Sequence, residues 1–347
     1  MTAQTRRLRP PRSRRTGFLL AAFIPTALVA LVLLQGALPA PALAAATELP
    51  APVSAGSESP ASIEDGGLSL STDVEACVVG ADQALPAVQL PLSAATWVGD
   101  WAHGIQVVNW LRYRTPRRHV VYLLGGSASR ESIISEANWS QQLAALSGKA
   151  TSAWVLSSKC QSFEEDRRLV TALPRQRGVV VINVGLSRFL TAHKPSTVSH
   201  TAVRTQPPGG WYQHHYDLRF PLSLAVQREL VREWVRDRSR LFAPRYPAKL
   251  ADLEAVVEAC LSRGLHPVLL DMPLNVVAVG HAFDDARALY REGCKALAEE
   301  QGIPYLRFGS SIGLHANDFY DLWHLLPSGR ATWQSKLSRL LVSKQIL

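Results

Sequence analysis

Short apolar segments alternate with longer amphipathic segments along most of the chain after residue 100. The apolar segments are rich in Val, Ile and Leu without polar alternation, which is typical of strands buried on both faces of a parallel sheet. Strands are predicted at 120–124, 153–156, 178–184, 266–272 and 304–308. Apolar residues at helical spacing predict helices at 101–112, 130–147, 162–173, 222–241, 249–263, 284–301 and 328–343. The alternation predicts a three-layer α/β domain at 73–347, built on a doubly wound, five-stranded parallel sheet.

One long segment, residues 190–218, fits neither pattern. It contains several prolines and glycines and ends in a polar-aromatic cluster, Trp211 to Tyr216. A loop of this length in a compact domain usually serves as a lid or a binding surface. A ligand-contacting role is therefore expected for this segment.

The first 46 residues have the layout of an export segment. Arginines crowd residues 6–15, an apolar run extends from Phe18 to Leu34, and Ala42-Leu43-Ala44 resembles a small-residue cleavage site. The apolar run is also long enough to span a bilayer, so a cleaved signal peptide and a membrane anchor are both open. Either one predicts an extracytoplasmic domain, secreted or tethered to the outer face of the membrane. Residues 47–72, rich in Ala, Pro, Ser and Gly, are predicted to form a flexible linker.

The net charge of +9 does not indicate a nucleic-acid-binding protein. Six arginines precede the first acidic residue, Glu48, and they account for most of this charge. No basic-aromatic array or zinc-finger spacing follows. A small-molecule or polysaccharide ester is the expected partner instead.

Cysteine and histidine positions predict no metal site. The four cysteines are Cys77, Cys160, Cys260 and Cys294. They allow up to two disulfides, with three pairings open. Buried free thiols are an equally consistent alternative for Cys260 and Cys294. No two cysteines have ligand spacing, and the adjacent His214 and His215 are poorly placed to share one metal ion. No metal or organic cofactor is expected.

The strongest chemical signal follows the first predicted strand. Gly125 and Gly126 end this strand, and Ser127 lies at the turn before the next helix. Strand, glycine turn, serine and helix can expose a nucleophile at the carboxyl edge of a parallel sheet, where backbone amides face developing negative charge. A turn of this kind can also serve only packing or helix capping. Ser129 is a second candidate nucleophile, but its position favours a helix-start residue.

A second signal lies just before the last predicted helix. Asp321 and His324 are three residues apart, which on one turn of α or 3₁₀ helix would place both side chains on one face. A carboxylate there can orient the imidazole, whose free nitrogen can then take a proton from a serine. The alternative is that His324 only caps a helix or closes a polar turn.

Together these segments resemble the SGNH hydrolases, also called GDSL-type esterases, over about residues 118–343. Gly125-Gly126-Ser127 stands where the family has Gly-Asp-Ser, with Gly126 in the Asp place, and Asp321-Leu-Trp-His324 matches the family's Asp-x-x-His. The resemblance implies Ser127 as nucleophile, His324 as general base and then acid, and Asp321 as its orienting partner. The Gly-Gly-Ser form is similar to a subgroup associated with bacterial envelope and polysaccharide acyl groups.

The expected oxyanion hole departs from the family pattern. The family uses the amide of the serine, a glycine amide after the second strand and an asparagine in Gly-x-Asn after the third. Here Ser157-Ser158 follows the second strand and Asn183-Val-Gly185-Leu-Ser187 the third. The candidate oxyanion and substrate-binding residues are Gly126, Ser157, Asn183, Gly185 and Ser187. Asn183 could supply the side-chain donor, Ser187 could replace it, or that donor could be absent, at a cost of about 10²–10³ in turnover.

The prediction is an exported serine esterase that cleaves or transfers an acetyl-like ester on a glycan or another envelope substrate. One alternative is a polysaccharide O-acyltransferase, in which a sugar hydroxyl replaces water as the acceptor. Another is a catalytically silent glycan-binding or scaffold domain that has kept the fold.

Overall fold

The computed structural model describes residues 88–93, 95–114, 118–191, 214–308 and 312–347. The predicted signal or anchor, the linker and Cys77 lie outside these ranges, as does most of the irregular segment 190–218. Within the described ranges, no helix has the length and apolar character needed to cross a bilayer.

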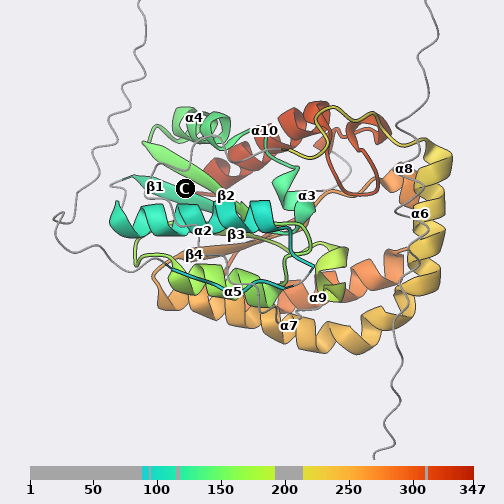
Figure 1. Ribbon diagram of the computed structural model, residues 1–347, viewed down its shortest axis with the longest axis horizontal. Coiled ribbons are helices and arrows are strands. Elements are labelled where there is room, and N and C mark those ends of the chain that lie inside the picture. Colours follow the sequence, from blue (N-terminus) through green and yellow to red (C-terminus); the bar gives the residue numbers. More distant parts are fainter. Residues whose placement is uncertain (1–87, 94, 115–117, 192–213, 309–311) are drawn as a thin grey trace, which may run out of the picture. The chain divides into compact units, whose positions relative to one another are not determined.

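The centre of the described part is a parallel sheet of five strands in the order β2-β1-β3-β4-β5 (Figure 1). Every neighbouring pair is parallel, as predicted. This order is the flavodoxin-like form of a doubly wound sheet, in which ligands bind at the carboxyl edge. The strands are β1 (His119–Gly125), β2 (Thr151–Ser157), β3 (Val179–Asn183), β4 (His266–Leu270) and β5 (Tyr305–Leu306).

Helices cover both faces of the sheet, so the domain has three layers (Figure 1). Side chains of β1 alternate between the two layers: Val121 and Leu123 pack with α4 and α10, whereas Tyr122 and Leu124 pack with the helices of the other face. The first face carries α4 (Glu136–Ser147) and α10 (Pro327–Ser343). The other face carries α2 (Val98–Tyr113), α5 (Phe163–Ala172), α7 (Ser239–Ser262) and α9 (Asp284–Glu300).

Two predicted helices have different boundaries in the structure. The helix expected at 130–147 is divided into α3 (Ser127–Arg130) and α4, because the Ser135 hydroxyl caps α4 by accepting the N–H of Asn138 at 3.1 Å. The helix expected at 249–263 begins ten residues earlier, since α7 runs through two prolines. Phe242 and Tyr246 of that extension pack on Phe189, so buried aromatic contacts accompany a helix that the prolines disfavour.

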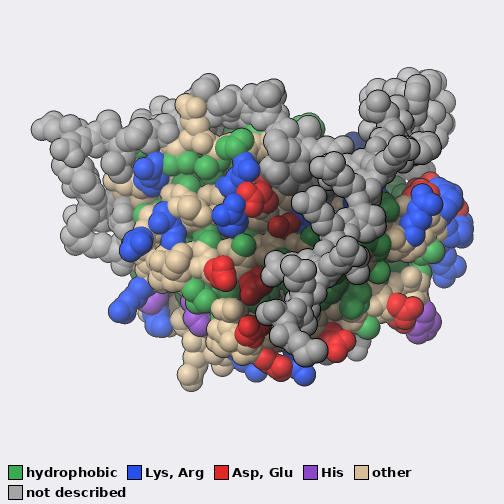
Figure 2. Space-filling model, turned by 90° about the horizontal axis from the view of Figure 1, so that it is seen from below, with side chains coloured by type: hydrophobic (Ala, Val, Ile, Leu, Met, Phe, Trp, Pro, Cys, Tyr) green, Lys and Arg blue, Asp and Glu red, His purple; other side chains and the backbone are tan. Residues whose placement is uncertain are grey.

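The remaining described elements are short or lie at the edge of the sheet. They are η1 (Leu186–Leu190), α6 (Leu224–Asp237), α8 (Val276–Val279) and η3 (Ala316–Asp318). On the face shown in Figure 2, basic, acidic and apolar side chains are intermixed. Cys160, Cys260 and Cys294 are free thiols, and burial raises the pKa of the thiols of Cys260 and Cys294. The buried-thiol alternative therefore describes those two residues.

Candidate active site

The turn after β1 is shaped by a glycine that no other residue could replace easily. Gly125 has φ +154°, and a Cβ there would lie 2.2 Å from the Ser129 hydroxyl and 2.7 Å from the Asn183 Cβ. Gly126 is the N-cap of α3, and Ser127 is the first residue of that helix. The close approach of the backbone to β3 therefore places Ser127 at the carboxyl edge of the sheet, where its side chain is partly exposed.

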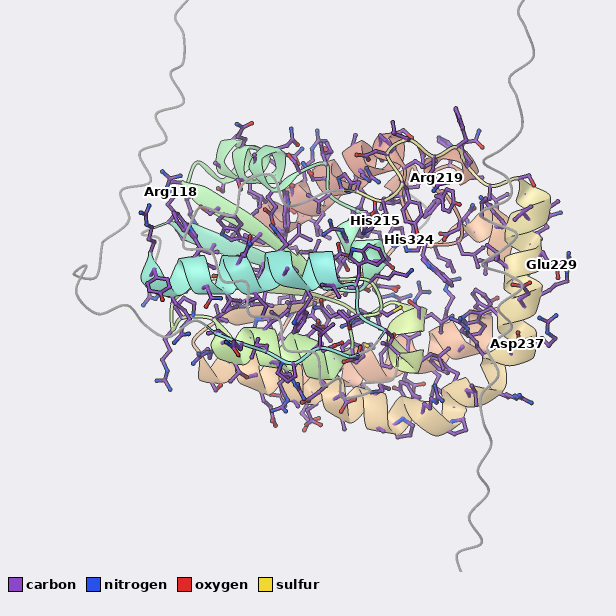
Figure 3. All side chains as sticks on the ribbon, viewed as in Figure 1. Arg118, His215, Arg219, Glu229, Asp237 and His324 are labelled. Atoms are coloured by element: carbon purple, nitrogen blue, oxygen red, sulfur yellow. The ribbon has the colours of Figure 1, made fainter. Side chains whose placement is uncertain are left out.

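The structure brings Ser127 into contact with His324, 197 positions later in the chain. The imidazole Nε2 lies 2.8 Å from the Ser127 Oγ, and Nδ1 lies 2.7 Å from the Asp321 Oδ2. These distances suit an imidazole that donates through Nδ1 to the carboxylate and accepts the serine hydroxyl through Nε2. His324, labelled in Figure 3, is 7% exposed. The hydrogen-bonded chain Asp–His–Ser is the geometry that a serine nucleophile requires.

The segment Asp321–His324 is not the helical turn that the spacing suggested. It is a bend inside a loop closed by a bridge between Phe319 and Leu325. The Asp321 Oδ1 accepts the N–H groups of Trp323 at 3.0 Å and His324 at 2.9 Å, while its other oxygen meets the imidazole. The predicted local conformation was wrong because the carboxylate itself builds the turn by capping backbone N–H groups.

The electrostatics of this loop keep Asp321 ionised. Burial raises the pKa of Asp321, but the charge and hydrogen bond of His324 and the two backbone N–H groups outweigh burial, so the pKa is below its usual value. An ionised carboxylate at Nδ1 stabilises the imidazolium that forms when the ring takes a proton.

Two predicted oxyanion residues are engaged elsewhere. The Asn183 amide donates through Nδ2 to the Ser129 Oγ at 2.8 Å and accepts the Gly185 N–H at 2.6 Å through Oδ1. The Ser157 hydroxyl is buried and donates to the Leu123 carbonyl at 3.0 Å. Asn183 thus ties the turn that carries Ser127 to β3, and the Ser129 hydroxyl is buried and engaged by this bond.

The other candidate oxyanion residues, Gly126, Gly185 and Ser187, lie near Ser127 in the structure. Gly185 and Ser187 line a pocket together with Ala128, the residue after Ser127. The Gly126 carbonyl accepts the N–H groups of Ser129 and Arg130, which leaves the first two N–H groups of α3, at Ser127 and Ala128, without a carbonyl partner in the described part of the chain.

One site residue, Tyr216, was missed by sequence reasoning. Its ring centroid lies 4.8 Å from that of His324 and 4.6 Å from that of Tyr320, and it stacks on the latter. Burial first, and then the charges of Asp321 and Glu131, raises the pKa of Tyr216. The only sequence signal for it was the polar-aromatic cluster at the end of segment 190–218. Residues 192–213 lie outside the described ranges, so the lid or binding role of this segment stays a prediction.

A buried charged network fixes the segment that carries Tyr216. Glu131 binds the Arg330 guanidinium, accepts the backbone N–H of His215 at 2.8 Å and lies 3.3 Å from the His214 Nδ1. Arg330 also pairs with Asp217. Burial raises the pKa of Glu131, but the contacts with His214, His215 and Arg330 outweigh it and lower the pKa. The network therefore connects α3, α10 and residues 214–217 beside the nucleophile.

A second connection runs from the same segment to α2. Asp100 lies 2.9 Å from the Nε of Arg130 and 3.3 Å from the Nε2 of His215. Arg130 is the last residue of α3 and Glu131 is its C-cap. Glu131 contacts residues 214–215 directly, and Arg130 is connected to His215 through Asp100. Within the described ranges, no group of three or more His, Cys, Asp or Glu side chains is arranged to hold a metal ion.

Trp323 separates two pockets beside the triad residues. One lies between the ends of β3 and β4 and helix α9, and includes Ala128, Ser187 and Arg287. The other lies between the Asp321–Trp323 segment and α6, and includes Glu233 and Asp237. In Figure 3, α6 with Asp237 stands opposite the end of the sheet where His324 is labelled.

Comparisons with known proteins give structural likenesses only. No family model matches the chain, and no curated protein matches it in sequence. A GDSL-like lipase from Bacteroides thetaiotaomicron has a TM-score of 0.33 at 12% identity, with coverage of 66% of this chain and 89% of that one. For a candidate lipolytic protein of the G-D-S-L family from Desulfitobacterium hafniense, the TM-score is 0.36 at 15% identity, with coverage of 64% and 99%.

A third likeness is to an active-site mutant of a family two carbohydrate esterase from Clostridium thermocellum. Its TM-score is 0.31 at 13% identity, with coverage of 65% of this chain and 64% of that one. Likenesses at this level carry no argument about the chemistry of this chain. The α/β fold predicted from the SGNH resemblance is confirmed by the sheet itself, which is parallel and has the order β2-β1-β3-β4-β5.

Proposed function

We propose that the protein is a serine ester hydrolase of the SGNH type. The observation that carries this proposal is the continuous chain of contacts from Asp321 through His324 to Ser127, at 2.7 and 2.8 Å. In the first step, the Ser127 Oγ attacks the ester carbonyl carbon while its proton passes to the His324 Nε2. The tetrahedral intermediate then expels the alcohol, which takes that proton, and an acyl-enzyme ester remains on Ser127.

Hydrolysis of the acyl-enzyme completes the cycle with the same groups. Water attacks the acyl carbon and gives one proton to the His324 Nε2, and this proton returns to the Ser127 Oγ as the carboxylic acid leaves. Asp321 accepts the Nδ1–H throughout and stabilises the imidazolium in both steps. Negative charge on the carbonyl oxygen falls to the N–H groups of Ser127 and Ala128, while Asn183 spends one Nδ2 hydrogen on Ser129 and its Oδ1 on Gly185.

The proposed substrate is an acetyl-like ester on a glycan or another envelope component outside the cytoplasm. Support comes from the export-like or anchor-like composition of residues 1–46 and from the Gly-Gly-Ser form of the nucleophile turn. Transfer of the acyl group to a sugar hydroxyl would use the same acyl-enzyme, with the sugar in place of water. Acylated oligosaccharide, found by mass spectrometry after incubation with an ester donor and a sugar acceptor, would distinguish transfer from hydrolysis.

The test is the hydrolysis of 4-nitrophenyl acetate by the full chain. We expect Ser127→Ala and His324→Ala to remove the enzymatic rate, whereas the matched serine variant Ser129→Ala should retain it. Equal rates for wild type and Ser127→Ala would reject the nucleophile. Absence of a rate in every folded form would favour the silent glycan-binding domain.

A further inference from the structure

The pocket between β3, β4 and α9 is lined by the chain neighbours of Ser127 and His324 and not by these two residues themselves. Ala128 follows Ser127, Trp323 precedes His324, and both line this pocket. Its free volume is about 30 Å³, which is room for about two water molecules at roughly 10–15 Å³ each. A group of a few atoms suits a pocket of this size.

The charge lining this pocket is positive. Arg287 and Arg291 of α9 both line it, and none of its lining residues is acidic. The Arg291 charge is already compensated, because its Nε and Nη2 lie 2.7 and 2.6 Å from the Asp271 carboxylate. Tyr290 donates to the same carboxylate at 2.6 Å. Asp271 is therefore occupied by Tyr290 and Arg291.

Arg287 is compensated much less. Its side chain is 18% exposed, and the Asp284 Oδ1 that faces its Nη1 is 3.7 Å away, beyond hydrogen-bonding distance. The other oxygen of Asp284 is engaged by the His281 Nδ1 at 2.7 Å. A partly buried guanidinium without a close acceptor can still accept an anion, and its planar fork suits two oxygens of one anion.

The pocket on the other side of Trp323 has the opposite character. Glu233, Asp237 and Asp321 line it, with Arg238 as its single basic residue. An anionic group would be repelled there and attracted on the α9 side. The two pockets therefore differ in the sign of the charged side chains that line them.

We propose that the α9-side pocket binds an oxyanion, a carboxylate or phosphate, that the ester substrate carries close to the reacting bond. Arg287 binds two of its oxygens, and Ser187, which lines the same pocket, donates its hydroxyl. This inference rests on the proposed function, because it assigns the substrate of the same site. Arg287 would determine which esters are processed, and Ser127 would carry out the reaction.

The test compares esters that differ only in charge. One pair places the charge on the acyl side, mono-4-nitrophenyl succinate against 4-nitrophenyl butyrate. The other places it on the alcohol side, 4-acetoxybenzoate against its methyl ester. In wild type we expect kcat/KM for the anionic member of one pair to be about 10- to 100-fold higher, the range for a hydrogen bond to a charged group. The responding pair identifies the side that carries the oxyanion.

Variants of one helix then assign the preference to Arg287. In Arg287→Met the ratio should fall to about one, and Arg287→Lys should keep part of it, since the charge remains but the planar fork is lost. The matched control is Lys295→Gln on the same helix, whose exposed side chain pairs with Glu299 at 3.6 Å, and it should keep the full ratio. A wild-type ratio near one for both pairs, or an unchanged ratio in Arg287→Met, would overturn the proposal.

A binding measurement keeps this result separate from the proposed esterase activity. Calorimetric titration of the full chain with succinate and with inorganic phosphate should show binding that weakens at least about tenfold in Arg287→Met. If the chain hydrolyses neutral esters but binds succinate and phosphate equally well in wild type and Arg287→Met, the oxyanion pocket is rejected and the proposed esterase activity stands. Oxyanion binding lost in Arg287→Met, in a chain that hydrolyses no ester, would reject the esterase and keep the pocket.

Discussion

The two sides of Ser127 are built in different ways. On the His324 side, Asp321, Tyr216 and the Glu131–Arg330 pair all support one orientation of the imidazole, directly or through residues 214–217. On the β3 side, Asn183 is a structural tie, and Ala128 lines a pocket that contains two arginines. One side therefore holds a fixed imidazole geometry, and the other offers a charged pocket in place of a free asparagine side chain.

The largest loss of activity is expected when the contact between Asp321 and His324 is altered. Asp321→Asn keeps the shape of the turn but removes the charge opposite Nδ1, so kcat should fall by about 10³–10⁴. Steady-state hydrolysis of 4-nitrophenyl acetate measures this loss. Asp318→Asn, in the same loop, is the control, because the Asp318 carboxylate caps His315 and contacts Ser328 instead of the imidazole, and its kcat should stay close to wild type. Equal losses in the two variants would contradict the role of Asp321.

Removing the buried charge of Glu131, which contacts residues 214 and 215, should lower the stability of the protein more than its kcat. Glu131→Gln leaves Arg330 without its buried carboxylate, and the free energy of unfolding at pH 7 should fall by about 3–5 kcal/mol. Chemical denaturation of both forms measures this difference. The exposed pair of Glu229 with Arg232 supplies the control, Glu229→Gln, for which the expected change is at most about 1 kcal/mol.

The same variant has a defined pH dependence. Because the pKa of Glu131 is lower in the folded protein than the value of about 4.3 in an unfolded chain, its contribution is fully present above that pH. It is lost as the pH falls through the folded-state pKa. The stability difference between wild type and Glu131→Gln should therefore shrink below about pH 4.3, and a difference that grows on acidification would show that Glu131 is not held ionised.

On the β3 side, Asn183→Ala separates a structural tie from an oxyanion donor. An oxyanion donor would cost about 10²–10³ in kcat, but with the amide bound to Ser129 and Gly185 we expect less than about tenfold. The unfolding free energy should instead fall by about 1–3 kcal/mol, since the buried Ser129 hydroxyl and the part-buried Gly185 N–H lose their partner. A double-mutant cycle with Ser129→Ala should show coupling in stability. A loss of two or more orders of magnitude in kcat at unchanged stability would reverse this assignment.

The smallest effect is expected at Tyr216. Replacing the ring that packs on His324 and Tyr320 with Tyr216→Leu should lower kcat by about two- to tenfold, the equivalent of an aromatic pair worth about 0.5–1.5 kcal/mol. Tyr216→Phe keeps the ring and should be close to wild type. If the phenylalanine variant were as impaired as the leucine variant, the hydroxyl rather than the packing would matter.

Much of the fold could be predicted because its signals are local. Strands β1 and β3 are apolar except at His119 and Asn183, since both of their faces are buried, and the glycine turn before Ser127 is visible as two adjacent residues. The Asp321–His324 spacing also predicted that the two side chains could meet, although a carboxylate-capped bend and not a helical turn brings them together.

The remaining features depend on contacts between distant segments. The orientation of Asn183 is set by Ser129, 54 positions earlier, and Tyr216 reaches His324 because Glu131 and Arg330 hold its segment. The predicted start of α7 was wrong because prolines disfavour a helix locally, and the sequence does not show that Phe242 and Tyr246 pack on Phe189. Spacing along the chain cannot show such contacts, so the arrangement on the β3 side of Ser127 could be read only from the structure.

Covalent labelling tests the proposed nucleophile most directly. The full chain is treated with a fluorophosphonate, digested, and searched by mass spectrometry for the modified peptide. We predict a single adduct on Ser127, absent from His324→Ala at short reaction times because the hydroxyl then has no base. An adduct on a different serine, or labelling that persists in Ser127→Ala, would contradict the assignment of Ser127.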